Sequence, residues 1–132
     1  MKRTPSGPTV APRDPRRESG RGLALVVLIP ALDEEASIGD VVARVPRVLT
    51  GVRSVEVVVV DDGSTDATAE RAREAGARVV SHERNRGLGA AFQTGLAEAR
   101  RRRADIVVNI DGDGQFAPED IAKVAEPIIS GR

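Results

Sequence analysis

The apolar run Ile106-Val107-Val108-Asn109-Ile110 leads directly into Asp111-Gly112-Asp113-Gly114-Gln115. Branched apolar residues without polar alternation are typical of a strand buried on both faces of a parallel sheet. Two aspartates two positions apart would project from one side of extended backbone, because side chains alternate along a strand. Their carboxylates suit a hard cation such as Mg²⁺ or Mn²⁺, and the glycines leave room for a ligand to approach. Aspartate and glycine are also the usual residues of a plain turn, which is the alternative interpretation.

Three further short runs have the same β-rich character, at Leu25–Ile29, Val55–Val60 and Arg78–Val80. Segments with helical spacing or helix-start signals separate and follow the strands: residues 36–49, 65–75, 89–103 and a fourth from Pro118 onward. Pro46 should kink or split the first of them. Strands that alternate with helices predict an α/β fold with a parallel sheet and right-handed crossovers.

The first 22 residues differ in composition from the rest of the chain. They hold four prolines, three glycines and almost nothing apolar, so they cannot bury enough surface to offset the entropy of ordering. Six basic and two acidic residues give this segment a charge of +4, which leaves −4 for residues 23–132 of the neutral chain. We expect a disordered basic tail (1–22) and one folded domain (23–132). Attraction of the tail to anionic lipid or nucleic acid is the alternative to a solvated tail.

Composition also excludes several classes of function. The chain has no cysteine, which excludes disulfides and thiolate chemistry. Only Phe92 and Phe116 are aromatic, which argues against a base-stacking platform and against nucleic acid as a partner. The apolar runs are below membrane-spanning length, and the basic start lacks the apolar stretch of a secretory signal. We therefore expect a cytoplasmic protein.

Polar clusters follow all four predicted strands. Acidic residues follow the first, second and fourth strands, as Glu34-Glu35, Asp61-Asp62 and the motif at Asp111, and a glycine-rich loop (87–91) follows the third. Ligands of open α/β sheets bind outside the carboxyl ends of the strands, so these clusters should share one edge. Adjacent aspartates at a strand end are costly unless donors or a cation meet them.

Each cluster also has a simpler interpretation. Glu34 and Glu35 can be first-turn helix acids, and Ser64-Thr65-Asp66 reads more readily as helix caps. The loop around Gly89 offers backbone N–H groups to an anion, or is only a linker. His82 stands alone and is expected to be a surface loop residue. Spacing excludes an EF-hand, a dinucleotide fingerprint, a P-loop and a nucleophile elbow.

Four ordered motifs together resemble the signatures of the family 2 glycosyltransferases, in the branch of dolichyl-phosphate mannosyltransferase and the bacterial polyprenyl-phosphate sugar transferases. They are Pro30-Ala31-Leu32-Asp33-Glu34-Glu35, Val60-Asp61-Asp62-Gly63-Ser64-Thr65-Asp66, Asn85-Arg86-Gly87-Leu88-Gly89-Ala90-Ala91 and Asp111-Gly112-Asp113-Gly114-Gln115. The resemblance implies a GT-A fold, a Rossmann-like three-layer sandwich with a mostly parallel sheet. One departure is Leu32-Asp33, where the family often has Tyr-Asn and so an aromatic surface for the base.

The resemblance also implies roles for individual residues. Pro30, Ala31 and Glu34 would line the nucleoside pocket, and the loop with Gly89 would contact the donor. Asp62, with Asp61, would accept hydrogen bonds from uracil or guanine, and Asp111 would face the ribose or the water shell of the metal. A final set of three, Asp113, Gln115 and Asp111, would hold Mg²⁺ or Mn²⁺ against the diphosphate.

The expected activity is metal-assisted, inverting transfer of a hexose from a UDP- or GDP-linked sugar to an acceptor, a polyprenyl phosphate at the inner face of the membrane. Family members continue well past the fourth strand, so the fold would be C-terminally incomplete. A catalytic base or acceptor site is expected beyond Arg132, and none within the chain. The alternative is a non-catalytic nucleotide-sugar-binding module that works with a complementing chain or by self-association. A sugar nucleotidyltransferase is more distant, because residues 32–35 lack a glycine-rich basic loop.

Overall fold

The computed structural model describes residues 9–10 and 22–131. Apart from Thr9, Val10 and Gly22, the tail expected at 1–22 lies outside the described residues. The elements follow in the order β1 (Thr9–Val10), β2 (Leu23–Ala31), α2 (Ile38–Ala43), β3 (Val52–Asp61), α3 (Thr68–Glu74), β4 (Arg78–Ser81), α4 (Leu88–Arg101), β5 (Ile106–Asn109), the 3₁₀ turn η1 (Pro118–Asp120) and α5 (Ile121–Ile129). No helix in this part of the chain is long and apolar enough to cross a membrane.

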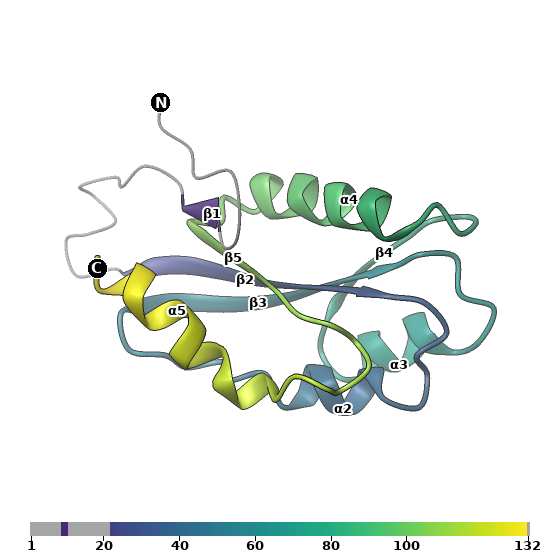
Figure 1. Cartoon of the computed structure of the whole chain (residues 1–132), viewed down its shortest axis with the longest axis horizontal. Helices are drawn as coiled ribbons and strands as arrows, with labels where there is room; N and C mark the ends of the chain where they lie inside the picture. The colour runs from purple at the N-terminus through teal and green to yellow at the C-terminus, as the bar shows by residue number, and fades with distance from the viewer. Residues whose placement is uncertain (1–8, 11–21, 132) are drawn as a thin grey trace.

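The strands form one mostly parallel sheet, as predicted. Their order is β1-β5-β2-β3-β4. Strands β2 to β5 pair in parallel, and β1 pairs with β5 in the antiparallel direction, with Thr9 opposite Val107. Figure 1 shows α4 on one face of the sheet and α2, α3 and α5 on the other. The predicted three-layer α/β sandwich is therefore confirmed.

Strand β2 is the centre of the fold, and all nine of its residues are buried. Alternate side chains serve two separate cores. Val27 and Ile29 belong to the core with α2, α3 and α5, whereas Val26 and Leu28 belong to the core under α4. At Gly95 of α4, an added Cβ atom would lie 2.0 Å from Cδ1 of Leu28. Helix α4 therefore approaches the sheet closely only because residue 95 has no side chain.

The order of the strands reverses beside β2. Strands β3 and β4 succeed one another on one side of β2, and β5 lies on the other side. A reversal of this kind leaves a crevice outside the carboxyl ends of the two strands that flank it, here β2 and β5. The predicted clusters at Glu34 and Asp111 follow these two strand ends.

The helix boundaries differ from the prediction where proline or tertiary contacts intervene. The segment expected to be helical over 36–49 is helical only in α2, because Pro46 would clash with the preceding turn and disfavours helical backbone at Val45. Helix α3 starts at Thr68 rather than Thr65, since residues 64–66 bond to a neighbouring loop. The segment at Pro118 begins with the turn η1 before α5.

Candidate functional site

A pocket of about 270 Å³ lies at the predicted edge of the sheet. Six residues that the sequence predicted for the site line it: Pro30, Ala31, Glu34, Asp62, Asp111 and Asp113. Six others line it that the sequence did not assign individually to the site, although Gly87, Leu88 and Ala91 belong to the predicted glycine-rich loop: Leu32, Asn85, Gly87, Leu88, Ala91 and Gly112. The walls thus come from the ends of β2, β3 and β5, the loop after β4 and the first turn of α4. Four segments distant in the sequence meet there, which is the arrangement predicted from the strand ends.

Three predicted site residues do not line the pocket. The carboxylate of Asp61 accepts hydrogen bonds from the Ser64 N–H (3.0 Å) and the Ser81 hydroxyl (3.3 Å). Gly89 lies in the first turn of α4 with open space where a Cβ atom would be. Gln115 is exposed beside the pocket, and its backbone N–H donates to Oδ1 of Asp113 at 3.0 Å. These three residues therefore contact a ligand only if the ligand extends past the pocket.

The two aspartates of the acidic loop meet at the pocket for a different reason from the one predicted. Strand β5 ends at Asn109, and Gly112 and Asp113 lie in a turn. The expectation that Asp111 and Asp113 share one face of extended backbone is therefore wrong. Both carboxylates line the pocket because the chain turns around Gly112, and Gly112 is buried against Ile38 and Ile29. A side chain at residue 112 would crowd this contact.

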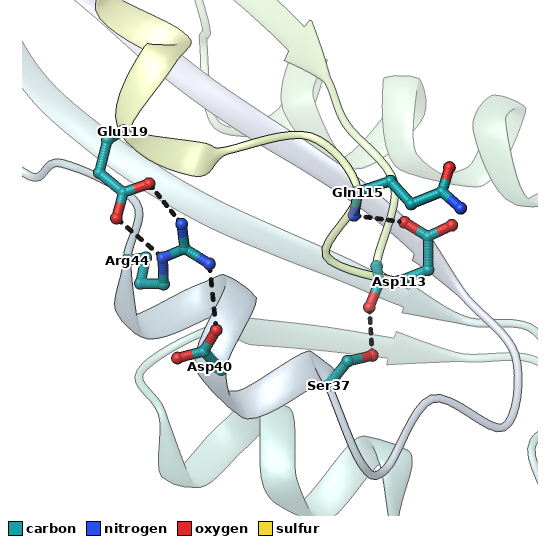
Figure 2. A network of polar contacts seen from close by, with 7 residues as sticks. Ser37, Asp40, Arg44, Asp113, Gln115 and Glu119 are labelled. Atoms are coloured by element: carbon teal, nitrogen blue, oxygen red, sulfur yellow. Dashed lines mark hydrogen bonds and ion pairs between the residues drawn. The ribbon is translucent and has the colours of Figure 1, made fainter.

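Helix α2 anchors the acidic loop at both ends (Figure 2). The Ser37 hydroxyl, just before α2, donates to the carbonyl of Gly112 at 2.7 Å. Arg44, just after α2, donates two hydrogen bonds of 2.8 Å to the carboxylate of Glu119, and a third of 3.2 Å to Asp40. The hydrogen bonds from Arg44 lower the pKa of the Glu119 carboxyl, so this pair stays charged at neutral pH. The segment between these anchors carries Asp113 and Gln115.

Negative charge concentrates where the acidic loop borders the pocket. Burial, followed by the charge of Asp113, raises the pKa of the Glu34 carboxyl above its usual value, although the hydrogen bond with Ser37 acts in the opposite direction. The charge of Asp111 also raises this pKa. The charges of Asp113 and Asp111 thus repel the Glu34 carboxylate, and this arrangement at one pocket favours the binding of a cation.

The donor set fits a cation that a ligand helps to bind. Among the residues that the structure describes, no three His, Cys, Asp or Glu side chains gather closely enough to hold a metal by themselves. Mg²⁺ sites in nucleotide enzymes often use one or two carboxylates together with phosphate oxygens and waters. Asp113 can supply such a ligand, because within the described part only its Oδ1 accepts a hydrogen bond.

The loop that carries Glu34 is held by the loop after β3. Asp33 has a φ of 51°, a left-handed conformation that aspartate and asparagine tolerate better than most residues. Its N–H donates to the Ser64 hydroxyl at 2.8 Å, and its carboxylate accepts from the Thr65 N–H at 2.9 Å. The Glu34 N–H donates to the hydroxyl of Thr68 at 2.8 Å. Among the predicted caps, Ser64 and Thr65 therefore bind the Glu34 loop. Asp66 also binds this loop by accepting the N–H of Glu35 at 3.2 Å, and its other oxygen accepts the N–H of Thr68, the first residue of α3, at 2.9 Å.

Asp62 is buried at the back of the pocket, with 4% of its surface exposed. It accepts hydrogen bonds from the N–H groups of Arg86 and Gly87, both at 2.9 Å, and from the ring of His82 at 2.7 Å. Burial acts to raise the pKa of the Asp62 carboxyl, but these hydrogen bonds outweigh it and lower the pKa below its usual value. Asp62 is therefore ionised at neutral pH, and it fixes the loop before α4.

His82 was expected to be a surface loop residue, and that expectation is wrong. Only 6% of its side chain is exposed, and its Nε2 lies 2.8 Å from the hydroxyl of Thr94 in α4. No local sequence signal marks this residue, because its partners are 20 and 12 positions away. The one hint in the sequence is that His82 directly follows the third strand, as the other polar clusters directly follow theirs.

Comparison with known proteins gives consistent matches. The sequence model of Glycosyl transferase family 2 matches residues 26–132. The chain is 37% identical over 123 residues to the UDP-N-acetylglucosamine–dolichyl-phosphate N-acetylglucosaminyltransferase of Methanococcus voltae, covering 80% of this chain and 47% of that protein. It is 35% identical over 109 residues to the dolichol-phosphate mannosyltransferase of Pyrococcus furiosus, covering 80% and 30%.

Solved structures give the same picture. Glucosyl-3-phosphoglycerate synthase of Mycobacterium tuberculosis, in complex with Mn²⁺, uridine diphosphate and glucosyl-3-phosphoglycerate, superposes with a TM-score of 0.68 at 34% identity. The match covers 83% of this chain and 40% of that one. The chain thus spans less than half the length of these relatives, and its fold is that of the GT-A glycosyltransferases.

Proposed function

This chain belongs to the family 2 glycosyltransferases, and from that premise we propose that its pocket is the donor site for a UDP- or GDP-linked sugar with a divalent cation. The observation that carries the proposal is the presence of Glu34, Asp111 and Asp113 at one pocket, where burial and then the charges of Asp113 and Asp111 raise the pKa of Glu34. A cation would relieve this repulsion, and a nucleoside diphosphate would complete its coordination.

The residues of the pocket divide between the two parts of the donor. A nucleoside would meet apolar surface at Pro30, Ala31, Leu32 and Leu88. Leu32 and Leu88 would stand in place of an aromatic platform. Asp113 and Asp111, with Gln115 beside them, would hold Mg²⁺ or Mn²⁺ at the diphosphate. When bound, such a cation neutralises the charge that develops on the leaving nucleoside diphosphate.

We extend the proposal to the complete reaction on the strength of the relatives. The enzymes of M. voltae and P. furiosus are transferases to dolichyl phosphate, so we propose an inverting hexosyl transfer to a polyprenyl phosphate at the inner face of the membrane. A phosphate acceptor is ionised at neutral pH, so holding it in line matters more than removing a proton from it. No residue within the chain is assigned to that role.

A titration of the protein with UDP in the presence of Mn²⁺ tests the donor site. We expect saturable binding by the wild-type chain, and binding weakened about tenfold or more by Asp113→Ala, the loss expected for an interaction with a charged group. Glu74→Ala is the matched control, because Glu74 is an exposed carboxylate in α3 that does not line the pocket. Equal affinity of the wild-type protein and Asp113→Ala contradicts the metal role of Asp113.

The alternative is a nucleotide-sugar-binding module without turnover. Incubation with labelled UDP- and GDP-sugars and polyprenyl phosphate distinguishes the two. Release of nucleoside diphosphate that depends on the acceptor supports the enzyme. Binding of the nucleotide without any release supports the module.

A further inference from the structure

Three elements that meet behind the pocket are joined through the ring of His82. Asp62 follows β3, His82 follows β4, and Thr94 lies in the middle of α4. The ring nitrogen Nδ1 lies 2.7 Å from Oδ1 of Asp62, and Nε2 lies 2.8 Å from Oγ1 of Thr94. His82 and Thr94 do not line the pocket, whereas Asp62 does.

Asp62 controls the path of the chain into α4. Its two oxygens accept the N–H groups of Arg86 and Gly87, and Gly87 and Leu88 line the pocket at the start of α4. The same loop lies so close to Gly63 that a Cβ atom there would be 2.4 Å from the backbone of Arg84 and Asn85. The position of this wall of the pocket therefore depends on the orientation of one carboxylate.

The chemistry of the contact sets the protonation of the ring. An ionised carboxylate only accepts hydrogen bonds, so Nδ1 of His82 must carry a proton at 2.7 Å from Asp62. Nε2 can then accept from the hydroxyl of Thr94 or, in the imidazolium form, donate to it. Either form keeps the ring hydrogen-bonded between α4 and Asp62, whereas an unprotonated Nδ1 would repel the carboxylate.

We propose that His82 is a positioning residue for the nucleotide pocket, which holds Asp62 in the orientation that fixes residues 86–88 against the ligand. The inference rests on the proposed donor site. A buried side chain that hydrogen-bonds to a binding group often determines the geometry of that group. His82 would thus affect nucleotide affinity without touching the nucleotide.

The ring proton can be observed directly, because His82 is the only histidine of the chain. A long-range ¹H–¹⁵N correlation spectrum of untagged, ¹⁵N-labelled protein contains a single imidazole, which needs no assignment. We expect Nδ1 to be protonated in the free protein and in the complex with UDP and the diamagnetic Mg²⁺. A neutral ring with its proton on Nε2 alone contradicts the proposal.

Binding measurements separate positioning from general stability. We expect His82→Ala to weaken UDP binding about tenfold in the presence of Mn²⁺, the size associated with loss of a hydrogen bond to a charged group. His82→Asn, whose amide can still donate to Asp62, should recover most of that affinity. Gln93→Ala is the control on the exposed side of α4. Thermal unfolding of each variant without ligand shows whether it is folded.

Each outcome has a distinct meaning. Folded His82→Ala with the affinity of the wild type overturns the positioning role. If His82→Ala does not fold, Thr94→Val removes only the hydroxyl partner of Nε2, with Thr94→Ser as the variant that retains it. Weaker UDP binding by Thr94→Val than by Thr94→Ser then supports the positioning role of His82, and equal binding overturns it. A wild-type protein that binds neither UDP nor GDP refutes the donor site itself and the positioning role with it, whatever the ring proton shows.

Discussion

At Glu34, binding and stability oppose one another. Burial and the charges of Asp113 and Asp111 raise the pKa of this carboxyl in the folded protein above its usual value of 4.5. A raised folded pKa means that the protonated form contributes stability, which is fully present below pH 4.5 and is lost as the pH rises through the folded pKa. Near neutral pH the ionised Glu34 therefore destabilises the fold, as expected of a group that serves a ligand.

We predict that Glu34→Gln stabilises the free protein near neutral pH. The gain should be about 0.5 kcal/mol, since water screens charges that are not fully buried, and it should disappear below pH 4.5. Urea unfolding of both proteins across this range measures it. A variant less stable than the wild type at neutral pH, or a gain that grows on acidification, would show that the carboxylates do not repel one another as described.

Single residues of the site were predictable where the chemistry is local. Glu34, Asp111 and Asp113 stand at strand ends in acidic motifs, and the structure brings them to one pocket. His82 was not predictable, because its environment is made by Asp62 and Thr94 from other elements. Asp62 illustrates both cases, since its strand end was evident but its three donors were not.

At the scale of the elements, the acidic loop depends on its anchors to α2. We predict that Arg44→Met loosens residues 112–119, because it removes the two hydrogen bonds to Glu119. Arg44→Lys should not restore them, since an ammonium group cannot make the paired contact of a guanidinium. Hydrogen exchange of the peptide over these residues should be faster in both variants, with global stability little changed because water screens an exposed pair.

Arg47→Met is the control for this prediction, because Arg47 is an exposed arginine of the same segment that does not bond to the loop. Exchange over the loop should match the wild type in that variant. Unchanged exchange in Arg44→Met would mean that the hydrogen bond from Ser37 to Gly112 is a sufficient anchor.

The packing of α4 on β2 predicts that glycine-to-alanine substitutions at two positions of α4 change stability in opposite directions. Gly95→Ala places a Cβ atom 2.0 Å from Leu28, and overpacking of this kind costs about 1–3 kcal/mol. Gly89→Ala, in the same helix, meets nothing within 4 Å, and should stabilise the protein by up to about 1 kcal/mol through helix propensity. Thermal and urea unfolding test both. Stability changes of the same sign in both variants would contradict the described packing of α4 on β2.

The centres of the elements were predictable from sequence, and the ends were less so. Apolar runs located all four parallel strands, but β2 extends to Ala31 and β5 stops at Asn109. Pro46 signalled the early end of α2. Nothing local signalled the late start of α3, since Ser64 and Thr65 bond to the loop at Asp33, more than 30 residues away.

At the scale of the whole molecule, the alternation of strands and helices predicted the parallel sheet and the shared edge. It did not predict which strands are neighbours. The order β5-β2-β3-β4 places the ends of β2 and β5 side by side, and this adjacency turns two separate acidic motifs into one site. The pocket is thus a property of the topology, and its chemistry is a property of the motifs.

The most direct test of this account is a crystal structure of the chain with UDP and Mn²⁺, with anomalous scattering to locate the manganese. We expect one manganese peak within coordination distance of the Asp113 carboxylate and of the diphosphate, with the uridine against Pro30 and Ala31. UDP bound elsewhere, or a pocket in which Asp113 faces only solvent while manganese and UDP are present in excess, would contradict the donor site.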